Sequence, residues 1–151
     1  MKHLSLGVLS LVVALSGYAG VSAPQEIPQE FVTIWNSHEA SGFEHFFTED
    51  AVWVPVAETR DEGRENIVKD LMVAHTSWAK KTRIQLDESI PVTVRFVRPE
   101  VATIFFRMKF LDQQNQPIAG LERAMVVVAV KDSNEWKVSA GQLTKESAPR
   151  K

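Results

Sequence analysis

Apolar residues in the first half of the chain recur at the spacing of an amphipathic α-helix. From Gln29 onward they fall at Phe31, Ile34 and Trp35, with His38 on the same face. A second and wider stripe is made up of Ile67, Val68, Leu71, Met72, His75, Trp78 and Ala79. The two stripes predict two helices that each pack one side against a core.

Shorter patterns lie between these two stripes. Phe43, Phe46 and Phe47 indicate one further helical turn. Residues 51–56 form a short apolar run that predicts a strand, and residues 58–63 are polar and predict a loop.

After Thr82 the apolar pattern changes to a period of two, which is typical of strands with one buried face. The predicted strands cover residues 92–96, 104–110, 119–130 and 136–144. Polar turn residues separate them, including Pro99-Glu100 and Asp132-Ser133-Asn134. Two helices followed by four antiparallel strands joined in order predict an α+β fold, with helices on one face of the sheet.

The first residues have the pattern of a secretory signal. Lys2 and His3 precede an almost entirely apolar run from Leu4 to Leu15, which is too short to span a bilayer. Small residues at Val21-Ser22-Ala23 favour cleavage after Ala23, although an uncleaved membrane anchor is the alternative. We therefore expect a signal peptide at 1–23, a lead-in at 24–28, one domain at 29–144 and a flexible tail at 145–151. The protein is expected to be periplasmic or secreted.

Charge and composition narrow the function classes. The chain has 17 basic and 19 acidic residues, and loss of Lys2 with the signal leaves 16 and 19, a net charge of −3. This balance argues against binding to nucleic acid, or to a membrane after signal cleavage. The absence of cysteine excludes disulfides and thiol nucleophiles. The remaining histidines, at 38, 45 and 75, lack the spacing of a known metal motif, so no metal or cofactor is expected.

Several strings resemble the SnoaL-like (SgcJ/EcaC-type) branch of the nuclear-transport-factor-2-like superfamily, which has a cystatin-like α+β fold. They are Phe46 to Trp53, Gly63 to Ile67, Met125 to Val128 and Glu135 to Gln142. The resemblance covers residues 29–144 and implies helices packed in the concave face of a strongly bent antiparallel sheet, which together form a cone with an apolar pocket. It also implies a homodimer built on the outer face of the sheet, with residues such as Arg95, Arg107, Lys109 and Thr103 facing that interface or solvent.

The resemblance does not settle the activity, because this fold hosts unrelated functions. Relatives include steroid isomerases, polyketide cyclases, dehydratases and epoxide hydrolases. Where isomerase-type relatives carry a carboxylate base, this chain has Val54, Pro55 and Val56. Where cyclase-type relatives carry an aspartate, it has Gln142, whose amide is not a general base at neutral pH.

Polar residues on otherwise apolar faces mark candidate pocket positions. His75 lies on the stripe of the second helix, where it is either an acid–base group or a core histidine bonded to a carbonyl. His38 lies near the end of the first helix, where a surface role is favoured. Trp53 and Trp78 are candidate apolar walls, with ordinary core packing as the alternative.

The last hairpin supplies the polar end of the expected pocket. A two-residue turn at Asp132-Ser133 pairs Arg123 with Gln142 on the same face as Trp136 and Val138. Unless that end opens to solvent, water, another strand or a ligand with acceptor oxygens must satisfy these two groups.

Three functions follow from these residues. The favoured one is binding of a small apolar molecule bearing a carboxylate or carbonyl near Arg123 and Gln142. The second is an isomerase, dehydratase or hydrolase that uses His75 as acid–base, with Arg123 stabilising an oxyanion. The third is an interaction module whose dimerisation is the function, which a filled interior favours.

Overall fold

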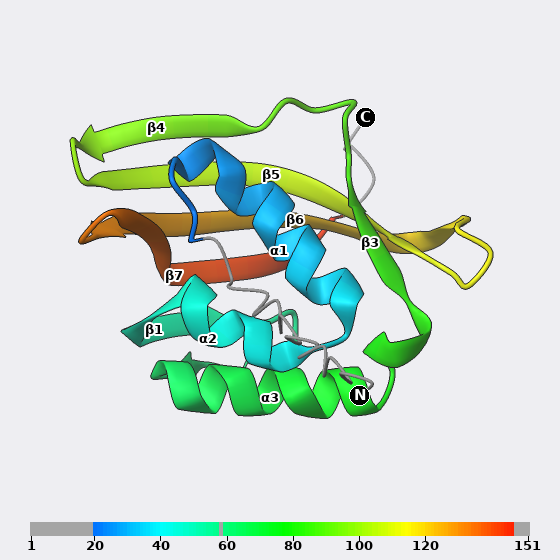
Figure 1. The fold of residues 1–151 in the computed structure, drawn as a ribbon. Helices are drawn as coiled ribbons and strands as arrows, with labels where there is room; N and C mark the ends of the chain where they lie inside the picture. Colours follow the sequence, from blue (N-terminus) through cyan, green and yellow to red (C-terminus); the bar gives the residue numbers. More distant parts are fainter. Residues whose placement is uncertain (1–19, 58, 147–151) are drawn as a thin grey trace, which may run out of the picture.

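The computed structural model describes residues 20–57 and 59–146, which form a layer of helices against one large sheet (Figure 1). The helices are α1 (Ile27–Ser37), α2 (Phe43–Phe46) and α3 (Arg64–Thr76), with short 3-10 turns at Pro24–Glu26 (η1), Ala40–Gly42 (η2) and Ala79–Lys81 (η3). The strands are β1 (Phe47–Val54), β2 (Asp61–Glu62), β3 (Arg83–Leu86), β4 (Thr93–Arg98), β5 (Val101–Leu111), β6 (Pro117–Asp132) and β7 (Glu135–Lys145).

The sheet has the strand order β2-β1-β7-β6-β5-β3, and β4 also pairs with β5. Strands β4 to β7 form the predicted antiparallel succession, so the α+β fold class is confirmed. Four details differ from the prediction. Strand β1 begins at Phe47, which the prediction placed in a helical turn, and β2 lies within the predicted loop 58–63. Strand β1 pairs in parallel with β7, which makes the sheet mixed, and β3 is a strand that the alternation did not indicate.

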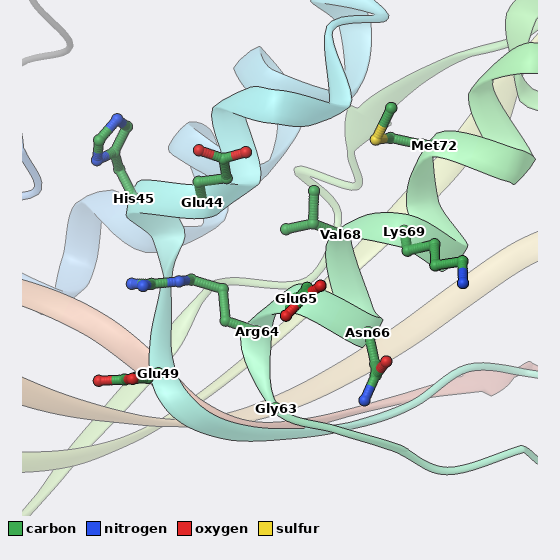
Figure 2. A pocket seen from close by; sticks show the side chains of 10 residues that line it. All are labelled: Glu44, His45, Glu49, Gly63, Arg64, Glu65, Asn66, Val68, Lys69 and Met72. Carbon is green, nitrogen blue, oxygen red and sulfur yellow. The ribbon is translucent and has the colours of Figure 1, made fainter.

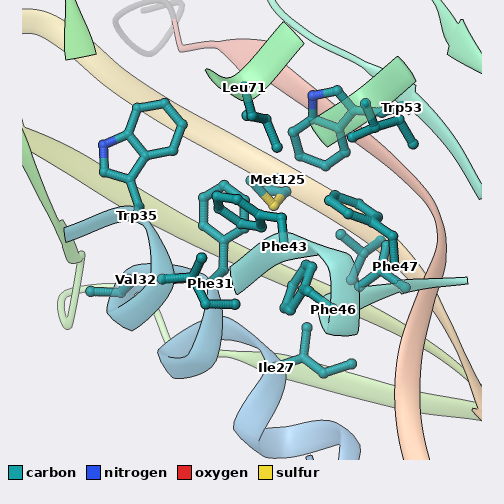
Figure 3. Packing of buried hydrophobic residues seen from close by; sticks show 14 of the residues in the cluster. Ile27, Phe31, Val32, Trp35, Phe43, Phe46, Phe47, Trp53, Leu71 and Met125 are labelled. Carbon is teal, nitrogen blue, oxygen red and sulfur yellow. The ribbon is translucent and has the colours of Figure 1, made fainter. Parts of the chain in front are cut away.

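The core lies between α1, α2 and the covered face of the sheet. Helix α1 crosses in front of the central strands (Figure 1) and buries Ile27, Phe31, Ile34 and Trp35. Phe43 and Phe46 pack against Phe31, and Phe47 packs against both of them (Figure 3). Each fully buried large side chain contributes about 1.5–3 kcal/mol. Side chains therefore fill this part of the cone interior.

Helix α3 buries a narrower face than its stripe predicts. Ile67, Val68, Leu71 and His75 are buried, whereas Met72 and Trp78 are more than half exposed. Part of the stripe is exposed because α3 lies at one end of the layer, where it packs against β1 and α2 and has solvent on its other side (Figure 1). Among the described residues, no helix is long and apolar enough to span a membrane.

The predicted register of the last hairpin is wrong. The turn consists of Ser133 and Asn134, and Gln142 pairs with Val126 instead of Arg123, which faces Lys145. An irregularity in the pairing between Val128 and Ala129 inserts one extra residue into β7. Because side chains alternate along a strand, one inserted residue moves all later side chains to the other face. Gln142 consequently lies on the outer face and Arg123 on the covered face with Met125 and Val127.

The expected signal segment falls largely on residues 1–19, and the end of the expected tail on residues 147–151, both outside the described residues. Residues 20–23 are described, as are Lys145 at the end of β7 and Glu146, whose N–H donates to the Glu122 carbonyl.

Candidate functional site

Three aromatic rings from different elements meet at one end of the helix layer. Trp35 of α1, Trp78 after α3 and Phe110 of β5 have ring centroids 5.7–6.0 Å apart. Trp35 and Phe110 are buried, while Trp78 is 55% exposed. With His38, His75 and Arg123 they form what we call the aromatic–histidine cluster.

The two histidines of this cluster contact each other. His38 ends α1 in the left-handed conformation, with φ of 58°, and its Nδ1 lies 3.3 Å from Nδ1 of His75. His75 is 5% exposed, and its ring stands edge-on to Trp35 at 4.6 Å between centroids. Burial, and secondarily the neighbouring His38, lower the pKa of His75 to about 4. His75 is therefore neutral at pH 7, and its ring binds a proton only in acid.

Two buried nitrogens of the cluster make no hydrogen bond to any described residue. They are Nε1 of Trp35 and Nε2 of His75. Trp35 is 4% exposed, so bulk water does not reach its N–H freely. Buried polar groups are nearly always paired, and an unpaired one costs about 1–3 kcal/mol. The arrangement thus has unused hydrogen-bonding capacity in its interior.

Arg123 closes the opposite side of the cluster. Its guanidinium lies over the Phe110 ring, 5.8 Å from the centroid, and donates to the carbonyls of Glu122 and Gly120 at 2.8 and 3.3 Å. Burial lowers the pKa of this guanidinium, an effect that the Glu122 carboxylate partly offsets. Within the described part of the chain, no carboxylate forms an ion pair with Arg123. Its charge is therefore available to an anionic group.

The structure brings together three of the five predicted site residues and separates the other two. His75, Trp78 and Arg123 belong to the cluster. Trp53 instead lies in the core beyond Phe31, with its ring against the backbone of Gly141. Gln142 is exposed on the outer face of the sheet.

Sequence reasoning missed Trp35 and Phe110 as cluster residues and treated His38 separately from His75. Trp35 and Phe110 follow their apolar patterns, so the sequence presents them as core. The contact between His38 and His75 joins residues 37 positions apart. It depends on how the ends of α1 and α3 meet, which periodicity does not reveal.

A cleft of about 780 Å³ lies elsewhere, between α2 and α3 (Figure 2). Its walls carry charges of both signs, which are exposed on Glu44, Glu49, Glu65 and Lys69 and half-buried on Arg64. A shallower cleft of about 530 Å³ lies around β2 and the outer side of α3. Most of the side chains that line the two clefts are charged or polar, whereas small-molecule sites are lined predominantly by apolar and aromatic side chains. No group of three or more histidine, aspartate or glutamate side chains in the described ranges is arranged to hold a metal ion.

Comparison with family models found no match, and neither did comparison with curated proteins. Solved structures do match. A domain of unknown function with a cystatin-like fold from Nostoc punctiforme is 21% identical, with a TM-score of 0.73 over 82% of this chain and 75% of that one. An NTF2-like protein with a cystatin-like fold from Novosphingobium aromaticivorans is 15% identical, with a TM-score of 0.66 over 83% and 80%.

A putative calcium/calmodulin-dependent protein kinase type II association domain from Thiobacillus denitrificans is 8% identical, with a TM-score of 0.72 over 86% of this chain and all of that one. Identities this low establish the fold and not the activity. The chain thus has the cystatin-like fold of nuclear-transport-factor-2-like (NTF2-like) proteins.

Proposed function

We propose that this protein binds a small apolar molecule bearing a carboxylate or carbonyl at the aromatic–histidine cluster. The observation that carries the proposal is the combination of flat apolar walls with a partly buried arginine that forms no ion pair with any described carboxylate. Small-molecule sites characteristically combine apolar and aromatic lining with a few convergent polar groups. We also propose that the chain belongs to the SnoaL-like branch of the NTF2-like superfamily.

Arg123 would hold the acidic end of the ligand. A guanidinium offers a planar set of donors that matches the two oxygens of a carboxylate. The apolar body of the ligand would lie against Trp35, Trp78 and Phe110. Because the core beyond Phe31 is filled, the ligand lies at the cluster and not deep in the cone. Trp78 is the exposed ring, so it is the side chain expected to move when a ligand enters.

The inner end of the cluster favours a ligand group that both donates and accepts hydrogen bonds. The indole N–H of Trp35 is a donor, while the neutral ring of His75 offers an acceptor or a donor according to its tautomer. A hydroxyl satisfies both. A ligand that reaches these atoms gains affinity, because it pairs groups that otherwise stay unsatisfied in the interior.

Calorimetric titration of the mature protein with decanoate and 2-naphthoate tests the proposal. Arg123→Gln should weaken binding roughly 10- to 100-fold, the value of a hydrogen bond to a charged group. Arg95→Gln is the matched control, because Arg95 is exposed on β4 and faces away from the cluster. Binding that is absent, or equally strong in Arg123→Gln, contradicts the proposal.

The second candidate is an isomerase, dehydratase or hydrolase in which His75 acts on a bound substrate. The contact between His38 and His75 favours it, since a second group that bonds one ring nitrogen fixes the orientation of an imidazole. Arg123 would stabilise an oxyanion. Under this candidate His75→Gln abolishes turnover and keeps the fold. Full turnover in this variant would show that His75 has a structural role only.

We also propose a homodimer formed by the outer face of the sheet. Val126 on that face is 49% exposed and lies opposite Phe105 and Gln142, which makes an apolar centre with a polar neighbour. One similar structure is described as a putative association domain. Sedimentation analysis should give a dimer for the natural chain and a monomer for Val126→Arg. A monomer in both cases would contradict this proposal.

A further proposal concerns the compartment in which the protein acts. We propose that the protein acts in the periplasm or outside the cell, without a nucleic-acid partner and without a membrane anchor once the signal is removed. The support is the positively charged start followed by the apolar run at 4–15. Fractionation of a bacterial host that expresses the full chain tests it, and protein retained in the cytoplasm contradicts it.

A further inference from the structure

Residues immediately before the first helix belong to the folded domain. Val21 is 8% exposed and is part of the hydrophobic core. Its carbonyl accepts a hydrogen bond of 2.8 Å from the N–H of Trp136, a buried residue at the start of β7. A buried N–H that loses its partner is destabilising. Gly20 lies close against Glu135, since a β-carbon at this position would fall 2.1 Å from that carboxyl group.

Ser22 and Ala23 form hydrogen bonds with Glu26, just before helix α1. The carboxylate of Glu26 accepts hydrogen bonds from the N–H of Ser22 at 2.9 Å, from its hydroxyl at 3.1 Å and from the N–H of Ala23 at 3.3 Å. The bonds from Ser22, and then that from Ala23, lower the pKa of Glu26. Residues 20–23 thus make both core and capping contacts.

Cleavage after Ala23 would remove all of these contacts. It would also leave a positive α-amino group on Pro24, at the start of the turn that leads into α1, where the helix dipole disfavours a cation. The bond itself joins Ala23 to a proline, whose nitrogen carries no hydrogen and whose ring restricts the preceding residue. The missing N–H removes one donor from the extended main-chain pairing by which proteins bind peptide segments.

The sequence contains a second pair of small residues at the required spacing. Gly17 and Ala19 flank Tyr18, and they follow the apolar run that ends at Leu15. We propose that a signal peptidase with specificity for small residues cuts after Ala19, so that the mature protein begins at Gly20. This inference rests on the proposed export and replaces the expected cut after Ala23.

Expression of the full chain in a bacterial host, with purification from the periplasm, gives the test. Intact mass and N-terminal sequencing should show a protein that begins at Gly20. A protein that begins at Pro24 overturns the inference and leaves export intact. An uncleaved chain in the cytoplasm overturns both proposals.

A matched pair of variants separates the two sites. Ala19→Leu places a large residue next to the proposed cut and should accumulate uncleaved precursor, whereas Ala23→Leu should be processed normally. The opposite pattern overturns the inference. As a second measurement, a chain that begins at residue 24 should melt about 5 °C or more below one that begins at residue 20, because it lacks Val21. Equal melting temperatures would overturn the structural argument for the site.

Discussion

The two aromatic regions of this protein differ in the polar groups that they contain. Around Phe31 the rings of Phe43, Phe46 and Phe47 pack against one another and contain no polar atoms. In the aromatic–histidine cluster, rings at similar spacing surround two nitrogens without a hydrogen bond and an arginine without an ion pair among the described residues. The first arrangement serves stability. The second retains polar groups at a cost in stability, which is characteristic of binding sites.

The largest effect is expected in the core. Phe31→Ala removes a fully buried ring and should reduce the free energy of unfolding by about 3–5 kcal/mol. Trp78→Ala in the cluster should cost much less, because that side chain is 55% exposed. Urea unfolding of both variants measures the contrast. Equal losses would show that the cluster stabilises the fold as strongly as the core does.

An intermediate effect is expected where Trp53 meets the sheet. A β-carbon on Gly141 would lie 2.6 Å from the Trp53 ring and 3.2 Å from Val127. Gly141→Ala should therefore overpack the core and cost about 1–3 kcal/mol. Gln142→Ala, one position further and exposed, should change stability by less than about 0.5 kcal/mol. A neutral Gly141→Ala would mean that Trp53 moves freely.

The pH dependence of stability should reveal His75. Its pKa falls from 6.5 to about 4 on folding, so the unfolded chain binds more protons between these values. The contribution of neutral His75 is complete above about pH 6.5 and is lost as pH falls toward 4, to the extent of roughly 3 kcal/mol. Urea unfolding at several pH values measures it, and His75→Gln should remove this part of the slope. An unchanged slope would show that other groups cause it.

The sequence predicted the parts of this structure that depend on local periodicity. The helix from Phe31 to Trp35, the turn at Phe43–Phe46 and the long strands all follow from the spacing of apolar residues. The second predicted helix was predicted less well, since two residues of its apolar stripe, Met72 and Trp78, are more than half exposed.

The candidate site depended on two features that are not local. One extra residue in β7 moves Gln142 away from Arg123, and a single irregularity of this kind leaves little trace in an apolar pattern. The approach of His38 to His75 depends on how the ends of α1 and α3 meet. The sequence therefore marked Arg123, His75 and Trp78 one by one as candidates, while their grouping required the fold.

The indole N–H resonances of the four tryptophans test the central claim most directly. Two of these residues, Trp35 and Trp78, lie in the cluster, and the other two, Trp53 and Trp136, lie in the core, so the protein contains its own control. A nitrogen–proton correlation spectrum recorded with increasing 2-naphthoate should shift the Trp35 and Trp78 signals and leave those of Trp53 and Trp136 in place, and Arg123→Gln should suppress the shift. Shifts confined to Trp53 and Trp136, or no shift at saturating 2-naphthoate, would contradict acid binding at the cluster.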